Sequence, residues 1–113
     1  MSDLKLAVIG VDHRHIYGQL AGMLELGCTC KGWWTEGDPQ PVEGFLKRFP
    51  DIPRVADRRE LLDDPEIDLV LIADIPARRA ERAIEAMKAG KDVMTDKPGC
   101  TTLEQLDAIK ATV

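Results

Sequence analysis

The stretch from Lys5 to Leu20 constrains the fold of this chain more than any other part of the sequence. It consists of an apolar run, Leu6 to Ile9, then Gly10, a short polar loop and a helical pattern that begins near Ile16. A continuous apolar run is typical of a parallel strand that is buried on both faces, and the i, i+4, i+7, i+8 spacing of apolar residues that follows is that of one helix face. The loop 10–15 therefore joins the carboxyl end of a strand to the amino end of a helix, where free N–H groups and the helix dipole favour an anion.

Strand and helix patterns then alternate through the rest of the chain. We predict strands at residues 6–9, 28–35, 53–56, 67–73 and 92–95, with helical patterns between them and after the last. The run Ile67–Ala73 is the strongest strand pattern, whereas 53–56 contains few apolar residues. Right-handed crossovers between parallel strands then give a doubly wound α/β sheet in the order 3-2-1-4-5, with helices on both faces.

Three helix starts carry recognisable sequence patterns. Asp38 followed by Pro39 would place a proline at the first helical position. Capping-box spacing, a small polar or acidic residue followed three residues later by Glu or Gln, favours helix starts near residues 57 and 101. The pairs concerned are Asp57 with Glu60 for the first start, and either Thr101 with Glu104 or Thr102 with Gln105 for the second.

Length and charge narrow the class of protein. The 113 residues suffice for one domain, and no apolar run approaches the roughly 20 residues that span a bilayer. A formal charge of −5 argues against a nucleic-acid surface, and three cysteines argue against a disulfide framework. We therefore expect a cytoplasmic protein without a signal peptide, a membrane segment or a nucleic-acid partner.

In a doubly wound sheet the ligand lies along the carboxyl ends of the strands, near the point where the strand order reverses. A response-regulator receiver would share the length, the five strands and a Lys-Pro after the last strand. Such a receiver needs an acidic pair after its first strand to hold magnesium, and here Asp12 is a single acid. The receiver is therefore disfavoured.

A combination of segments favours another family. The segments are a strand that ends in Gly10, an acid after the second strand, IDLVLIADIP after residue 66, AGKDVMTDKP around the last strand, and the helix TTLEQLDAI. Together they resemble the Gfo/Idh/MocA family of NAD(P)-dependent oxidoreductases. The resemblance implies a Rossmann-like domain over residues 1–113. It also implies that this domain is the amino-terminal part of a longer, two-domain protein.

The resemblance also implies roles for particular residues. Gly10 matches the first glycine of the dinucleotide fingerprint and would permit the tight turn. Glu36 would meet the adenosine ribose hydroxyls, which favours NAD over NADP as cofactor. Lys97 matches the lysine of the family's Glu-Lys-Pro motif and would be the catalytic residue, close to the nicotinamide and the substrate hydroxyl. Pro98 would shape that loop.

The sequence departs from the family pattern at several positions. Asp12 and His15 replace the second and third fingerprint glycines, and Asp96 replaces the family's glutamate. Asp12 would either face the cofactor or cap the following helix and occupy the N–H groups that a phosphate would use. We expect His13 and His15 to line the cofactor cleft or to contact the substrate, and Arg14 to meet a phosphate; no metal site is predicted from these residues. The complete cofactor-binding set is Gly10, Asp12, His13, Arg14, His15, Glu36, Ala73, Pro76, Asp96, Lys97 and Pro98.

Two functions follow as hypotheses. The first is the nucleotide-binding domain of a dehydrogenase that acts on a sugar, cyclitol or related hydroxyl compound, inactive as an isolated domain and part of a homo-oligomer. The alternative is a non-catalytic dinucleotide-binding or interaction module that has lost two fingerprint glycines. We interpret the arginines at 78, 79 and 82 as a solvated helix face.

Overall fold

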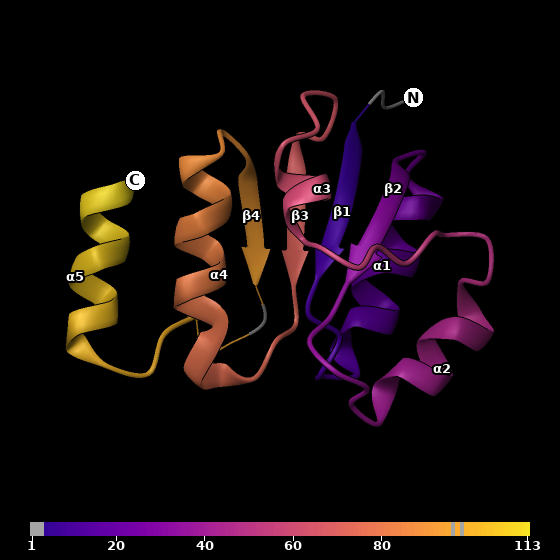
Figure 1. Ribbon diagram of the computed structural model, residues 1–113, viewed down its shortest axis with the longest axis horizontal. Helices are drawn as coiled ribbons and strands as arrows, with labels where there is room; N and C mark the ends of the chain where they lie inside the picture. The colour runs from indigo at the N-terminus through magenta and orange to yellow at the C-terminus, as the bar shows by residue number, and fades with distance from the viewer. Residues whose placement is uncertain (1–3, 96, 98) are drawn as a thin grey trace.

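The computed structural model describes residues 4–95, 97 and 99–113, and it shows one parallel sheet in this part of the chain. Its four strands are β1 (Lys5–Ile9), β2 (Thr29–Trp34), β3 (Leu69–Ile72) and β4 (Asp92–Thr95). They are ordered β2-β1-β3-β4 (Figure 1). The chain order reverses between β1 and β3, so the carboxyl ends of these two strands mark the point where a ligand would lie.

The predicted strand at residues 53–56 is wrong. This segment runs beside β2, as the order 3-2-1-4-5 requires, but only one bridge forms, between Trp33 and Arg54. Trp33 N–H donates to Pro53 O at 3.0 Å, and Val55 N–H donates to Trp33 O at 2.9 Å. Pro53 has no N–H to extend the ladder. The described sheet therefore has four strands instead of five, while the order of these four is as predicted.

Helices cover both faces of the sheet, which confirms the doubly wound α/β class (Figure 1). Alternate residues of β1 point to opposite faces. Leu6 and Val8 pack with α1 (His15–Glu25) and α2 (Pro41–Arg48), while Ala7 and Ile9 pack with α3 (Arg59–Leu62) and α4 (Pro76–Lys88). The central strands are buried on both sides, as their continuous apolar sequences indicate.

Two of the predicted helix starts require correction. Helix α2 begins at Pro41 instead of Pro39, so the proline at its first position is the later one. Asp57 does not form a capping box, because the residue that precedes α3 is Arg58. The Asp57 carboxylate instead accepts a hydrogen bond from the N–H of Arg59 at 2.9 Å. The pair Thr102 and Gln105 does form the predicted capping box, at the start of α5 (Leu103–Thr112).

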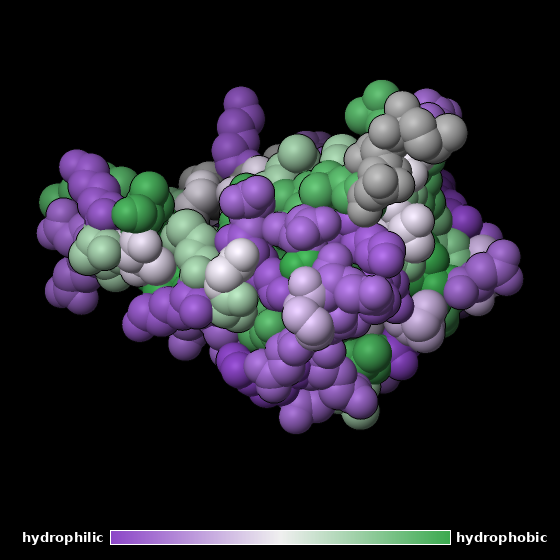
Figure 2. Space-filling view, turned by 90° about the horizontal axis from the view of Figure 1, so that it is seen from above, coloured by the Kyte–Doolittle hydropathy of each residue, from purple (hydrophilic) through white to green (hydrophobic). Residues whose placement is uncertain are grey.

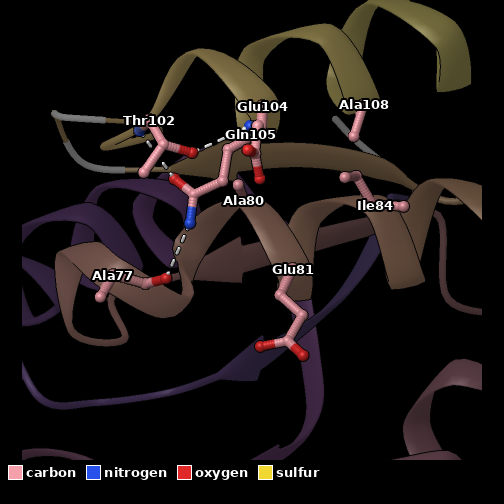
Figure 3. Close-up of a pocket in the computed structure, with 8 residues that line it drawn as sticks. All are labelled: Ala77, Ala80, Glu81, Ile84, Thr102, Glu104, Gln105 and Ala108. Atoms are coloured by element: carbon pink, nitrogen blue, oxygen red, sulfur yellow. Dashed lines mark hydrogen bonds between the residues drawn. The ribbon is translucent and has the colours of Figure 1, made fainter.

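Helix α5 lies outermost, beyond α4 (Figure 1). Gln105 Nε2 donates to Ala77 O at 3.0 Å, and this bond ties the start of α5 to the start of α4 (Figure 3). A pocket of about 450 Å³ lies between the two helices, and it is lined by Ala77, Ala80, Glu81, Ile84, Thr102, Glu104, Gln105 and Ala108 (Figure 3). Residues 103–112 are all described and none of them is buried, so α5 is attached to the domain by a small contact.

Salt bridges lie at the end of the sheet where the strands begin. Lys31 Nζ lies 2.7 Å from Asp64 Oδ2 and 2.6 Å from Glu66 Oε1, and Lys5 lies near the same glutamate. Hydrophilic side chains cover the middle of this end (Figure 2). Lys31 lowers the pKa of Asp64 and of Glu66 by hydrogen bonding to both carboxylates. The opposite end of the sheet, where the strands finish, carries the candidate site.

Candidate functional site

The carboxyl ends of the strands bring together most of the residues that the sequence singles out. The loop 10–15 follows β1, Glu36 lies just beyond β2, Ala73 ends the buried run that contains β3, and Lys97 follows β4. Lys97 is exposed. Pro76 is the first residue of α4, while Asp96 and Pro98 lie outside the described residues. The nine described members of the predicted set thus share one edge of the sheet.

The turn at Gly10 is required by backbone geometry. Gly10 has a φ of 87°, a conformation that side chains with a Cβ rarely adopt. A Cβ at this position would lie 2.7 Å from Asp74 Cβ and 2.8 Å from Asp74 N. Gly10 N–H donates to Trp34 O at 2.7 Å, and Gly10 O accepts from Ala73 N–H at 3.1 Å. This glycine therefore lets the chain leave β1 pressed against the end of β3.

The loop after Gly10 uses several of its backbone donors internally. Val11 N–H donates to Thr35 Oγ1 at 3.1 Å, His13 N–H to Ala73 O at 2.9 Å, and His15 N–H to His13 Nδ1 at 3.1 Å. The imidazole of His13, not a carboxylate, thus meets the amino end of α1. These three N–H groups would have to change partners before they could bind a phosphate.

The interpretation of Asp12 as a helix cap is wrong. Arg14 directly precedes α1, and Asp12 turns toward the end of β2, where it accepts from Thr35 Oγ1 at 3.5 Å. Asp12 also lies against Asp74, whose side chain is almost fully buried. Burial and, after it, the charge of Asp74 raise the pKa of Asp12. Two carboxylates therefore meet where the family pattern has a glycine beside the phosphate.

We expect Asp12→Asn to stabilise the chain at neutral pH. Because the pKa of Asp12 in the folded chain is above its ordinary value of 3.8, the folded state binds this proton more tightly than the unfolded state does. The unfavourable contribution is thus complete above the raised pKa and disappears as the pH falls toward 3.8. The stability difference between the Asn variant and the wild type should be largest at neutral pH and shrink on acidification. Urea unfolding across this range measures it, with the exposed Asp51→Asn as a control; a difference that grows on acidification would contradict the prediction.

Behind the loop lies a buried group of charges. Asp74 Oδ2 accepts from Arg82 Nε at 3.0 Å, Asp74 O accepts from Arg79 Nε at 2.7 Å, and the Arg82 guanidinium lies 5.0 Å from the centre of the Trp34 ring. Arg79 is 1% exposed and Arg82 is 8% exposed. The interpretation of these two arginines as a solvated face is therefore wrong. Sequence reasoning missed this cluster, and the available signal was an acid directly after the most apolar strand.

Arg78, by contrast, is partly exposed and reaches across the edge. Its Nη1 donates to Glu36 Oε2, which joins the first turn of α4 to the end of β2. The side chains of Arg78 and Glu36 are 43% and 54% exposed. The predicted ribose-binding acid thus carries a cationic partner that the sequence did not reveal.

A cleft of about 400 Å³ opens beside the loop, between the start of α1 and the segment that leads into α2. It is lined by Asp12, His13, Arg14, Pro39, Gln40, Pro41 and Ile75. The imidazole rings of His13 and His15 are 4.2 Å apart. Within residues 4–95, 97 and 99–113, no group of three or more His, Cys, Asp or Glu side chains could hold a metal ion. The same residues include no helix both long and apolar enough to cross a membrane.

The fold and the residues at the carboxyl ends of the strands are together typical of a dinucleotide-binding α/β domain. The model of an oxidoreductase family with an NAD-binding Rossmann fold, Gfo/Idh/MocA, matches residues 37–113. The chain belongs to this family, and the family's cofactor is the nicotinamide dinucleotide that the sequence predicts.

Two dehydrogenases that are similar in sequence to this chain agree with the family assignment. Levoglucosan dehydrogenase of Pseudarthrobacter phenanthrenivorans is 35% identical over 74 residues, which are 66% of this chain and 19% of that protein. The scyllo-inositol 2-dehydrogenase (NADP(+)) IolW of Bacillus subtilis is 32% identical over 69 residues, 61% of this chain and 19% of that protein. The aligned segments thus span about a fifth of these curated relatives.

Solved structures agree over nearly the whole chain. A protein from Erwinia carotovora atroseptica, described as an oxidoreductase, superposes with a TM-score of 0.91 at 38% identity. The superposition covers 97% of this chain and 33% of that one. Levoglucosan dehydrogenase in complex with NADH superposes with a TM-score of 0.73 at 27% identity, over 97% of this chain and 32% of that one.

The donor set at the edge fits a nicotinamide dinucleotide, with one departure from the usual arrangement. Glu36 presents a carboxylate just beyond β2, the cleft beside the loop has apolar walls at Pro39 and Ile75, and Lys97 is exposed after β4. In the loop 10–15, three backbone donors are already engaged, and the negative charge of Asp12 disfavours a bound phosphate. Arg14 lies exposed at the same cleft, and a guanidinium is a group that binds phosphates well.

Proposed function

We propose that this chain binds the nicotinamide cofactor of a dehydrogenase that acts on a hydroxyl group of a sugar, cyclitol or related compound. The observation that carries the proposal is the gathering of the Gly10 loop, Glu36 and Lys97 at one edge of a sheet from this family. The names of two relatives, a levoglucosan dehydrogenase and a scyllo-inositol 2-dehydrogenase, support the substrate class. Because the chain spans about a third of its solved relatives, most substrate contacts would come from outside these residues.

In this proposal each of the chain's own groups has a limited task. The bound nicotinamide would accept a hydride from the carbon that carries the hydroxyl. Lys97 would donate a hydrogen bond to the hydroxyl oxygen and help to pass its proton on as the carbonyl forms. Glu36 would hold the adenosine ribose, Arg14 would meet the pyrophosphate, and Ala73 and Pro76 would form the wall beside it.

The test has a binding arm and a turnover arm. NADH should raise the unfolding midpoint of the 113-residue chain. At a hundredfold excess of NADH over its Kd, the stabilisation is about 2.7 kcal/mol. In the longest natural form of the polypeptide, a panel of sugars and cyclitols should reduce the dinucleotide. There, Lys97→Met should lower kcat by about 10²–10⁴-fold, while the exposed control Lys110→Met should not. NADH binding with equal turnover in both lysine variants would contradict the role of Lys97.

A second candidate function rests on the loop itself. The internal bonds of Val11, His13 and His15, with the carboxylates of Asp12 and Asp74, favour a module that no longer binds a dinucleotide. If NADH leaves the midpoint of the wild type unchanged but raises that of Asp12→Gly, this second candidate replaces the first. Binding by the wild type would exclude it.

A further inference from the structure

The acid at the end of β2 and the first turn of α4 form a charged bridge across the ligand edge. Arg78 donates to Glu36 although the two residues are 42 positions apart in sequence. Both side chains are about half exposed, so a ligand that reaches this corner meets both of them. An exposed ion pair contributes little to stability, so its loss would destabilise the fold only slightly.

Arg78 stands where a helix disfavours a cation. It is the third residue of α4, and the first turn of this helix contains arginines and no acid. The positive end of the helix dipole repels such a side chain and favours an anion. Glu36 supplies that anion in the free protein. A phosphate group would be a better partner, because it carries more negative charge and accepts two parallel hydrogen bonds from a guanidinium.

A second arginine approaches the same loop from the other side. Arg54 Nη2 donates to Gly37 O at 2.7 Å, and its Nη1 donates to Asp38 Oδ1 at 3.0 Å. Arg54 also lines a pocket of about 350 Å³ with Thr35, at the end of β2. Each acid of the loop 36–38 therefore has an arginine beside it, and the corner does not repel anions as a lone Glu36 would.

We propose that Arg78 determines which nicotinamide dinucleotide this chain accepts, by moving from Glu36 to the 2′-phosphate when NADPH binds. The inference rests on the proposed function and concerns its adenosine end. In dinucleotide folds an acid after the second strand bonds the ribose 2′-hydroxyl, whereas a nearby arginine accommodates a 2′-phosphate. This chain presents both groups in contact. NADH uses Glu36 with Arg78 still paired to it, and NADPH uses Arg78, so the two Kd values lie within about tenfold of each other.

The experiment measures Kd for NADH and for NADPH by the quenching of tryptophan fluorescence in the 113-residue chain. Arg78→Met keeps the length of the side chain and removes its charge. It should weaken NADPH by about 10–100-fold, the effect of losing charged hydrogen bonds, and change the Kd of NADH by less than about threefold. Glu36→Gln should tighten NADPH and weaken NADH. Arg59→Met, which removes an exposed arginine paired with Asp63 on α3, is the matched control and should leave both Kd values unchanged.

The outcomes separate this inference from the proposed function. If the wild type binds a dinucleotide and Arg78→Met leaves the ratio of the two Kd values unchanged, Arg78 does not determine the choice and the proposed function stands. The same conclusion follows if Arg78→Met weakens NADH and NADPH equally, because Arg78 then contacts a part that both share. If the wild type binds neither dinucleotide, the proposed function fails and this inference fails with it.

Discussion

Replacing Gly10 with alanine is expected to lower the free energy of unfolding by about 2–5 kcal/mol. Two costs add at this position. The φ of 87° is unfavourable for any residue with a Cβ, and the new Cβ would lie 2.7–2.9 Å from the Cβ, N and Cα atoms of Asp74. Backbone atoms at the end of β3 have little freedom to move away, because Ala73 N–H is bonded to Gly10 O. Urea unfolding monitored by tryptophan fluorescence measures the change.

Gly37→Ala is the matched control for the steric part of this effect. Gly37 has a φ of 67°, but among the described residues outside 36–38 no atom lies within 4 Å of the place that its new Cβ would take. Its replacement should therefore cost only the backbone strain, about 1–2 kcal/mol. If the two variants were equally destabilised, the close approach of Gly10 to Asp74 would not contribute.

Arg82→Met should destabilise the chain by about 3–5 kcal/mol. The side chains of Arg82 and Asp74 are 9% and 2% exposed, so removal of the guanidinium leaves a carboxylate buried without its charged partner. The carboxylate of Asp12 lies beside that of Asp74, and the two negative charges repel each other. The guanidinium also packs over the ring of Trp34, and that contact is lost too. Chemical denaturation gives the free energy, and the tryptophan fluorescence, to which Trp34 contributes together with Trp33, reports on the changed surroundings.

Two further variants separate charge from packing in this result. Asp74→Asn in the Arg82→Met background removes the orphaned charge and should restore part of the lost stability. Arg59→Met breaks an exposed pair, with side chains 52% and 65% exposed, and should change stability by no more than about 1 kcal/mol. No recovery in the double variant would mean that packing on Trp34, not the buried charge, accounts for the loss.

Local sequence patterns predicted the parts of the fold that depend on burial. The apolar runs at β1 and β3 specify strands covered on both faces, and their alternation with helical patterns specifies a parallel sheet. The prediction of a strand at 53–56 was wrong because tertiary packing sets the place of this segment beside β2. Pro53 limits its pairing with β2 to one bridge. The start of helix α2 was predicted two residues too early. Both Pro39 and Pro41 suit a first helical turn, and the local sequence does not distinguish between them.

The candidate site could be predicted only in its position along the chain. Strand ends identify the edge, so the sequence predicted that Gly10, Glu36 and Lys97 lie along it. Side-chain pairing between distant segments was not visible there. Arg79 and Arg82 look like a solvated face because a helical pattern treats arginine as polar, yet Asp74 satisfies both of them in the interior. The roles of the individual site residues stay predictions until the binding experiments are made.

The slight attachment of α5 has a consequence for the energetics of the domain. Because none of its ten residues is buried, this helix gains little from the hydrophobic effect; it depends on its capping box and on the bond from Gln105 to Ala77. Its opening free energy should then be well below that of the sheet. We therefore expect residues 103–112 to open as a separate unit while the strands that carry the ligand edge stay folded.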